Sequence, residues 1–366
     1  MGYVAVKGGT IAIEESIKKL KYERLKGKRI LDVEDIRCGM RGLIDQVMSE
    51  SSLYSEELAS IAVKQTEGNS EEAVFVLRAY RSTLPRKHYT KTVNTANMNV
   101  ERRISASFKD IIGGQILGAS YDYTHRLIDF DLCNETLEES LKWVREFENQ
   151  YIDKEDNTEL GRLPKVVDYL RKEGLIKSCE DDNQQPSDIT KKSLEFPSQR
   201  SERLQILTRG QTGAVTSLGY AALRAYGATH PTVGELRIGK LDLYINNPLD
   251  DSDDEQEEFY IGDICVTEVE SFIPNISEKK FGKKELEFVI GYGICYGQNE
   301  TKAIAMSILD NCLEVPDSRY PTSDEEFVLY NIDSVESTGF ISHLKLPHYV
   351  TFQSKLDSVR KTRKEK

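Results

Sequence analysis

The first part of the chain shows the spacing of apolar residues that is typical of amphipathic helices. Apolar residues recur every three or four positions in 13–20 and again in 33–50. Ser55 stands where one N-cap is expected and either Asn69 or Ser70 where the next is expected, each before a further helical pattern. The run at 3–7 predicts a short strand ahead of these helices, so this part is expected to be mainly helical after one strand.

Between residues 100 and 132 the helical spacing gives way to an alternation of apolar and polar residues, which is typical of strands. The segments ERRISASF and DYTHRLIDFDL both alternate in this way, and the glycines of IIGGQILG between them predict a turn. We therefore expect two strands here, joined through that turn.

A second set of elements follows a polar stretch around EDDNQQPSD. SERLQILTRG and TGAVTSLGYAALRAYG predict two helices, and LRIGKLDLYI, FYIGDICVTEV and LEFVIGYGICYG predict three strands before a helix that begins at Asn299 or Thr301. The sequence thus predicts an α+β fold, helix-rich with antiparallel sheet in front and with a second α+β part behind. We expect an N-terminal domain over 1–133, a variable connector over 134–203 and a C-terminal domain over 204–366.

Composition narrows the class of protein. The 366 residues are 39% hydrophobic and 30% charged, which is typical of a folded, soluble protein. No apolar run approaches the ~20 residues that a membrane span needs, and the start is no secretory signal, so a cytoplasmic protein is expected. The six cysteines are spaced too widely for a zinc-ribbon or iron–sulfur pattern, which favours free thiols.

Charge is spread unevenly along the chain. The net charge of −12 argues against general binding to nucleic acid or to anionic lipid. Between Arg78 and Arg126, however, nine Lys or Arg residues face only three acidic ones, a local balance of +6. Such a basic island in an acidic protein is a candidate site for a small, highly charged anion.

Four arginines are the candidate anion ligands in this island. Arg78 and Arg81 lie one helical turn apart in LRAYRSTLPR, and Arg102 and Arg103 point to opposite faces of the strand predicted at ERRISASF. A buried guanidinium needs a carboxylate or a phosphate as its partner. The four side chains are therefore candidates for a substrate oxyanion pocket, with solvated or ion-paired arginines as the alternative.

Asp122 and Asp129 are the candidate catalytic carboxylates, because a carboxylate near a ribose anomeric carbon stabilises an oxocarbenium-like transition state. A structural ion pair on a strand is the alternative for each. His343 and His348 lie around Pro347 in HLKLPH, and a bend at the proline would allow the two imidazoles to converge. They are candidate ligands of a zinc-like divalent metal, which a substrate or another chain would have to complete.

Taken together, these segments resemble the I subunit of the carbon–phosphorus lyase core complex. The resemblance runs in order through most of 3–132 and 205–355, whereas 134–200 and the acidic loop at 250–258 depart from it. The segments that carry it are YVAVKGG, LRAYRSTLPR, ERRISASF, GGQILG, YDYTHRL, DEEFVL and GFISHLKLPHYV.

The resemblance implies an enzyme subunit of phosphonate metabolism. With partner subunits of the G, H and L types it would replace the adenine of ATP by an alkylphosphonate at the ribose anomeric carbon, and alone it would act as a purine nucleoside-triphosphate nucleosidase. It would also form the central pair of an assembly that contains the radical-type J subunit. The histidine pair would lie at the interface with that subunit, beside a bound metal or anion.

Three classes of function stay open at this point. The chain is either the catalytic glycosyl-transferring subunit, or a non-catalytic scaffold that lends His343 and His348 to the active site of a partner, or a stand-alone nucleotide-binding protein. Release of purine from ATP, measured with and without partners, distinguishes them.

Overall fold

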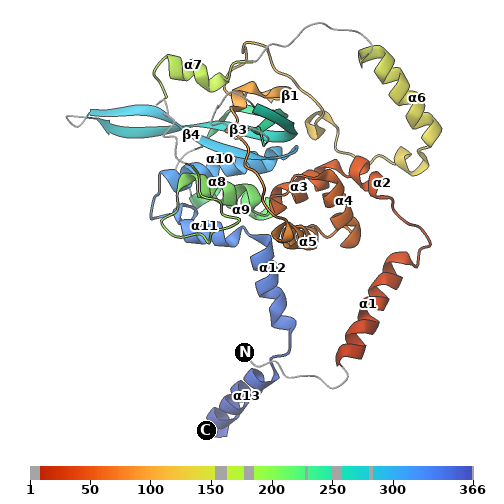
Figure 1. Cartoon of the computed structure of the whole chain (residues 1–366). Helices are drawn as coiled ribbons and strands as arrows, with labels where there is room; N and C mark the ends of the chain where they lie inside the picture. Colours follow the sequence, from red (N-terminus) through yellow and green to blue (C-terminus); the bar gives the residue numbers. More distant parts are fainter. Residues whose placement is uncertain are drawn as a thin grey trace.

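The computed structural model describes residues 9–152, 163–176, 185–226, 230–248, 258–279 and 283–364. Within these residues, helices surround one antiparallel sheet of four strands (Figure 1). The predicted α+β fold is therefore confirmed. The strand predicted at 3–7 lies outside the described residues.

The sheet joins segments that lie far apart in the sequence. ERRISASF supplies the first strand, and the three strands predicted in the C-terminal part supply the others. Because the first strand pairs with the second, residues from the predicted segments 1–133 and 204–366 share one sheet. The order is β1 (Asn99–Ile104), β2 (Thr232–Asn246), β3 (Glu258–Lys279) and β4 (Lys283–Tyr296), each antiparallel to its neighbours.

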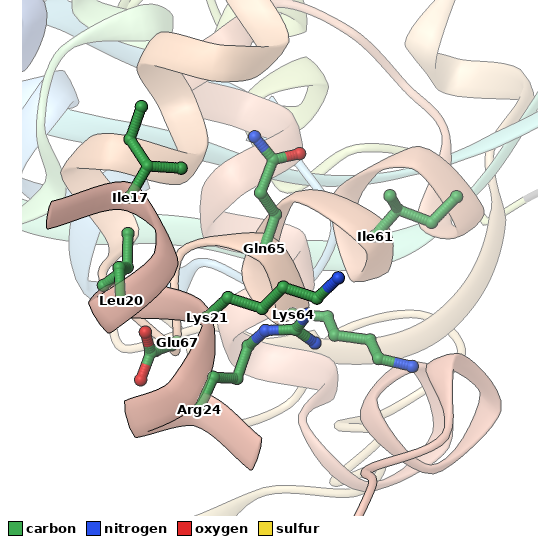
Figure 2. A pocket seen from close by; sticks show the side chains of 8 residues that line it. All are labelled: Ile17, Leu20, Lys21, Arg24, Ile61, Lys64, Gln65 and Glu67. Atoms are coloured by element: carbon green, nitrogen blue, oxygen red, sulfur yellow. The ribbon is translucent and has the colours of Figure 1, made fainter. Parts of the chain in front are cut away.

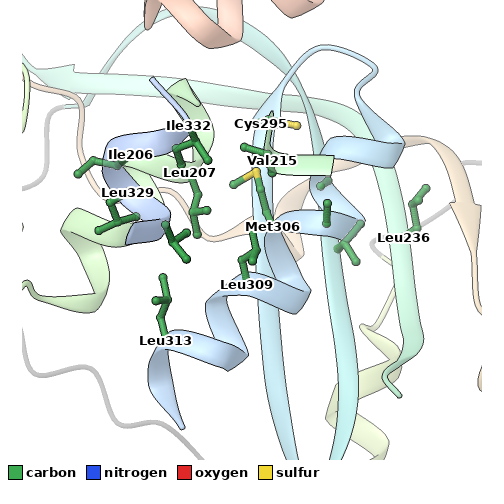
Figure 3. Packing of buried hydrophobic residues seen from close by; sticks show 14 of the residues in the cluster. Ile206, Leu207, Val215, Leu236, Cys295, Met306, Leu309, Leu313, Leu329 and Ile332 are labelled. Carbon is green, nitrogen blue, oxygen red and sulfur yellow. The ribbon is translucent and has the colours of Figure 1, made fainter. Parts of the chain in front are cut away.

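One face of the sheet is apolar and carries the main core. Helices α8 (Arg200–Arg209), α9 (Thr212–Ala221), α10 (Glu300–Glu314) and α11 (Glu325–Asn331) lie on this side (Figure 1). Their apolar side chains meet those of β2, β3 and β4, as Figure 3 shows for Leu236, Cys295, Met306 and Leu309. Burial of such side chains from water is the main force that holds helix to sheet.

Two glycines of β4 allow α10 to approach the sheet closely. A Cβ atom at Gly291 would lie 2.1 Å from the carbonyl oxygen of Ser307, and one at Gly293 would lie 2.1 Å from that of Ala303. Neither clash could be relieved without moving the helix backbone. Any larger residue at these positions would therefore push α10 away from the core.

The predicted N-terminal helices form a second, smaller core. They are α2 (Val33–Gly39), α3 (Arg41–Ser51), α4 (Glu56–Gln65) and α5 (Ser70–Thr83). Ser55 and Asn69 cap α4 and α5 as predicted, because each side chain accepts a hydrogen bond from the first turn. The single helix predicted over 33–50 is interrupted at Met40, whose φ of −120° and ψ of 37° lie outside the helical region. Gly39, a weak helix former, directly precedes this break.

The strand predicted over DYTHRLIDFDL is wrong. Residues Tyr121–Tyr123 form a 3₁₀ turn, and Arg126 has a φ of 53°, which is incompatible with a strand. The alternation belongs to an exposed, irregular segment, and no sheet face lies behind it. The preceding turn is confirmed, since Gly113 and Gly114 have φ values of 83° and 71° and lead the chain back to β1.

Several helices extend away from both cores, although α12 begins against α5, where Ser334 is buried and Val335 packs on the smaller core (Figure 1). None of the residues of α1 or α6 is buried. Among the described residues, no helix is both long and apolar enough to cross a membrane. The outlying helices are α1 (Gly9–Leu25), α6 (Leu137–Phe147), α12 (Ser334–Ser342) and α13 (Tyr349–Lys364).

The remaining helix, α7 (Val166–Lys172), covers the other face of the sheet, opposite α8 to α11 (Figure 1). Val166, Val167 and Leu170 pack there against Phe272. Next to this small apolar contact, the sheet face carries buried charged side chains, and further along it a small apolar cluster forms around Met98, Leu241 and Val266. Buried charged side chains are thus concentrated on the α7 face of the sheet.

Candidate functional site

Arg78 is buried where α5 meets the C-terminal part of the chain. Its Nη1 donates to both carboxylate oxygens of Asp333, at 2.8 and 2.7 Å. Nε and Nη2 donate to the backbone carbonyl of Glu50 at 3.0 and 2.8 Å, and Nη2 also donates to that of Arg209 at 3.0 Å. Burial raises the pKa of Asp333, but the facing Arg78 outweighs it and leaves that pKa below its ordinary value. Arg78 therefore joins the helical cluster to the rest of the protein.

Arg81, one turn further along α5, is half-buried. Its Nη1 donates to the backbone carbonyls of Ser51 and Ser52, at 2.5 and 3.5 Å. Burial, together with the neighbouring Arg78, lowers the pKa of this guanidinium. A second cation placed beside an arginine in this way favours an anionic partner.

Arg102 and Arg103 point to opposite faces of β1, as predicted. Arg102 donates to Asp122 at 2.7 Å and to Glu300, at the start of α10, at 3.1 Å. Arg103, with no exposed surface, donates to Glu235 at 2.5 Å and to the carbonyls of Ile112 and Pro164 at 2.6 and 2.7 Å. Both guanidinium groups are ion-paired within the chain, which is the alternative named for them above.

Asp122 and Asp129 both lie in the exposed, irregular segment that replaces the expected strand. Asp122 bridges Arg102 and Arg126, the latter at 3.3 Å. The Asp129 carboxylate accepts a hydrogen bond from the backbone N–H of Asp131 at 3.0 Å. Asp122 is therefore an ion-pair partner and Asp129 a turn-stabilising residue, and a catalytic role for either stays a prediction.

His343 and His348 lie close together at the junction of α12 and α13. Their ring centroids are 5.6 Å apart. In each ring Nδ1 lies against a backbone carbonyl, that of Phe340 for His343 and that of Leu346 for His348, at 2.6 Å in the second case. A carbonyl oxygen only accepts, so each Nδ1 donates its proton to that carbonyl and Nε2 is the ring nitrogen left for other contacts.

This tautomer is the one found in metal-binding histidines, which usually donate their other N–H to a carbonyl or carboxylate. The pair therefore fits two ligand positions of a zinc-like ion. Throughout the described ranges, no group of three or more His, Cys, Asp or Glu side chains lies together as a metal site. A third ligand for such an ion would have to come from outside these residues.

The sequence reasoning missed a buried charged cluster on the α7 face of the sheet. Glu268 and Glu270 of β3 lie there with Arg237 of β2 and Lys165, and all four side chains are buried. Lys165 Nζ lies 2.8 Å from a Glu268 carboxylate oxygen and 3.4 Å from one of Glu270. The signal was present in the strand FYIGDICVTEV and its continuation, where two glutamates at i and i+2 share one face of an apolar strand.

A groove of about 370 Å³ lies between α1 and α4, away from all these residues (Figure 2). Ile17, Leu20 and Ile61 form its apolar wall. Lys21, Arg24 and Lys64 add positive charge at its rim. The groove is open to solvent along its length, since the apolar face of α1 is exposed.

Fold and side chains together define an α+β protein with a buried cluster of charged side chains on its sheet and two neighbouring histidines at the junction of α12 and α13. Residues 2–366 match the family described as bacterial phosphonate metabolism protein PhnI. The chain belongs to this family.

Curated relatives match over almost the full length. The chain is 41% identical to alpha-D-ribose 1-methylphosphonate 5-triphosphate synthase subunit PhnI of Rhizobium meliloti, over 99% of this chain and 95% of that protein. It is 39% identical to the protein of the same name from Escherichia coli, over 99% of both. HtxH of Stutzerimonas stutzeri, named as a provisional C–P lyase subunit, is 40% identical over 99% of this chain and 96% of that protein.

Proposed function

We propose that this chain is a catalytic subunit of a carbon–phosphorus lyase core complex. With G-, H- and L-type partners it replaces the adenine of ATP by an alkylphosphonate at ribose C1, which yields ribose 1-alkylphosphonate 5-triphosphate. Without partners it hydrolyses purine nucleoside triphosphates to the free base. The observation that carries this proposal is the full-length similarity to two proteins whose names state this synthase.

The charge distribution supports a polyphosphate substrate. Arg81 is best suited to bind it among the four predicted arginines, because its guanidinium is half-buried and next to a second cation. Arg78 and Arg103 have a structural role in this proposal. Each donates to a carboxylate and to two backbone carbonyls and so holds the surrounding elements in place. A phosphate group would add charge-assisted hydrogen bonds to a site prepared in this way.

The test is release of adenine from ATP, followed by chromatography, for the purified chain alone and with its G-, H- and L-type partners. Alone, the chain should release adenine and leave ribose 5-triphosphate. With the partners and methylphosphonate, phosphorus NMR should show the ribose 1-methylphosphonate product instead. Absence of base release under both conditions would reject the catalytic proposal.

The second candidate is a scaffold that lends His343 and His348 to the J-type partner. The arrangement of the two imidazoles favours it, since both Nε2 atoms are available on an outlying arm with exposed apolar residues around them. In this case adenine release would come from partner subunits. Replacing both histidines by alanine would then abolish cleavage of the C–P bond and leave adenine release unchanged.

A further inference from the structure

The buried cluster on the α7 face contains two carboxylates in unequal surroundings. Glu268 accepts hydrogen bonds from Lys165 at 2.8 Å, from Thr95 at 2.6 Å and from Tyr292 at 2.9 Å, and a fourth from Arg237. Glu270, two residues along the same strand, accepts one long bond of 3.4 Å from Lys165. Both carboxylates contact the ammonium group of Lys165, so they are close neighbours. They differ in the number of hydrogen bonds that they accept.

The pKa values of the two groups are driven apart. Burial raises the pKa of Glu268, but Arg237, Lys165 and the hydrogen bonds outweigh it and lower that pKa to about 2. Burial also raises the pKa of Glu270, where Lys165 does not compensate and the charge of Glu268 adds to the increase. Compared with free glutamates, the protein thus favours the ionised form of Glu268 and the protonated form of Glu270. Such a pair is the arrangement that acid–base enzymes use.

Two polar atoms of the cluster have no hydrogen-bond partner among the described residues. They are Oε2 of Glu270 and Nη1 of Arg237, on side chains that are 5% and 2% exposed. Leaving buried polar atoms unpaired is costly. Eight such side-chain atoms occur among the described residues, and in this cluster an unpaired acid and an unpaired guanidinium N–H lie beside a second carboxylate. The orphaned acid and the orphaned guanidinium N–H therefore point to a ligand that offers an acceptor to each.

We propose that Glu268 and Glu270 are the catalytic carboxylates of the glycosyl transfer, with Glu268 stabilising the ribosyl cation and Glu270 protonating the departing purine. This inference rests on the proposed function. It replaces Asp122 and Asp129, which lie exposed in an irregular segment, as the residues that carry the chemistry. Arg237 is a positioning residue that holds Glu268 in its ionised state.

The step balances as follows. The C1′–N9 bond of ATP breaks and its electron pair goes to the purine, while the Glu270 carboxyl proton moves to a purine ring nitrogen. The ionised Glu268 offsets the positive charge that develops on the ribose ring. An oxygen lone pair of the alkylphosphonate dianion, or of water in the nucleosidase reaction, then forms the new C1′–O bond. In the nucleosidase reaction the attacking water gives up a proton to the Glu270 carboxylate, and in the transfer reaction Glu270 regains its proton from solvent.

Residues 163–176 cover this pair and must move for ATP to reach it. Lys165 reaches down to both glutamates, Val166 N–H donates to Glu235 at 2.9 Å, and the Pro164 carbonyl accepts from Arg103. The apolar contact is small, limited mainly to Val166, Val167, Leu170 and Ile176 against Phe272. Polar as well as apolar contacts thus hold this cover, and a polyanionic substrate can compete for Lys165.

The experiment compares Glu268→Gln and Glu270→Gln in the full chain, with Glu50→Gln as a control. Glu50 is a fully buried glutamate whose carboxylate caps Thr212, at the start of α9, and its Oε2 is unpaired like that of Glu270, so this variant controls for the loss of a buried carboxylate as such. Adenine release should fall at least about 100-fold in both test variants and stay near wild type in the control, given the size of general-acid effects. Circular dichroism and urea titration confirm that each variant is folded.

A substrate with an activated leaving group separates the two roles. The base of 7-methylguanosine 5′-triphosphate carries a positive charge and leaves without protonation. Glu270→Gln should therefore regain most of its activity on this substrate, whereas Glu268→Gln should not. In the wild type, activity on ATP should decline as pH rises through the raised pKa of Glu270, and this decline should disappear with the methylated substrate.

The outcomes separate this inference from the proposed function. If the wild type releases no base from either substrate, alone or with partners, the proposed function is rejected. If the wild type is active and both folded variants keep their activity, the carboxylate pair alone is rejected. Hydrogen exchange gives a readout independent of activity: in Glu270→Gln, saturating ATP should increase deuterium uptake in 163–176. Unchanged uptake would also overturn the proposal, because the pair would then stay covered.

Discussion

The α7 face of the sheet and the C-terminal arm, which is formed by α12 and α13, both carry ionisable side chains. The two regions differ in how far these side chains are buried and paired. On the sheet, Glu268 and Arg237 are almost without exposed surface and bond to each other and to their neighbours. On the arm, His343 and His348 contact each other and backbone carbonyls, amid side chains such as Phe340 that are largely exposed. Among the described residues, Glu268 is thus fully paired by its neighbours. The two histidines, in contrast, have mainly local contacts.

This difference bears on the two kinds of chemistry in the proposed function. A buried cluster with shifted pKa values is typical of a site that acts on a substrate directly. Two neighbouring imidazoles can supply only part of the ligands of a metal ion. Under the proposed function, glycosyl transfer is therefore assigned to the sheet, and chemistry shared with a partner is assigned to the histidine pair.

The largest effect on stability is expected from removing Arg103, the fully buried arginine that pairs with Glu235 beside the sheet cluster. Arg103→Ala leaves the carboxylate of Glu235 buried and unpaired, and it removes the bonds to Ile112 and Pro164. The free energy of unfolding should fall by about 3–5 kcal/mol, as measured by urea titration. Arg126→Ala, at an exposed arginine, is the control and should change it by less than about 0.5 kcal/mol. Equal effects would mean that the sheet face is not a structural centre.

Lowering the pH should reveal how much Glu268 contributes to the free energy of unfolding. Its pKa of about 2 in the folded chain lies below that of an unfolded glutamate, so it stabilises the fold above about pH 4.5. This contribution, about 3 kcal/mol in full, is lost as pH falls from there toward 2. Glu270 acts in the opposite sense, because its raised pKa favours the fold at low pH and that gain is lost as pH rises.

The measurement is the slope of unfolding free energy against pH between about 4.5 and 3, for the wild type and for Glu268→Gln. The variant should be less stable at neutral pH, since Lys165 and Arg237 lose their partner. Its slope in this window should also be flatter. Parallel slopes would show that Glu268 is not held ionised by its neighbours.

Local patterns in the sequence predicted most of the secondary structure, because they depend on short-range physics. The caps at Ser55 and Asn69 and the three C-terminal strands needed only nearby residues to be recognised. The strand at DYTHRLIDFDL failed for the complementary reason. Alternation describes a sheet face only when a neighbouring strand is present, and the chain supplies none there.

The site was harder to predict, because it depends on which segments meet. Nothing near Arg78 in the sequence announces Asp333, 255 positions away, as its partner. Lys165 likewise reaches glutamates that lie more than 100 residues further along the chain. Charged residues inside apolar strands are the one local sign of such a cluster, and they mark β2 and β3 here. The opposite orientations of Arg102 and Arg103 were predictable, since they follow from the pleat alone.

The smallest effect on stability is expected on the arm. Replacing both His343 and His348 by alanine should change the free energy of unfolding by less than about 0.5 kcal/mol, because the rings are partly exposed and bond only to local carbonyls. The same variant should lose zinc from the assembly reconstituted with its partners, measured by metal analysis after gel filtration. His230→Ala is the matched control, since its Nδ1 also meets a backbone carbonyl, at 3.1 Å. If the double variant retains zinc, the two histidines are not zinc ligands. If it loses much stability, the two imidazoles have a structural role. The expected result is an unchanged free energy of unfolding together with loss of zinc. Ligands that depend on another chain to complete a metal site contribute to metal binding and little to the stability of their own fold.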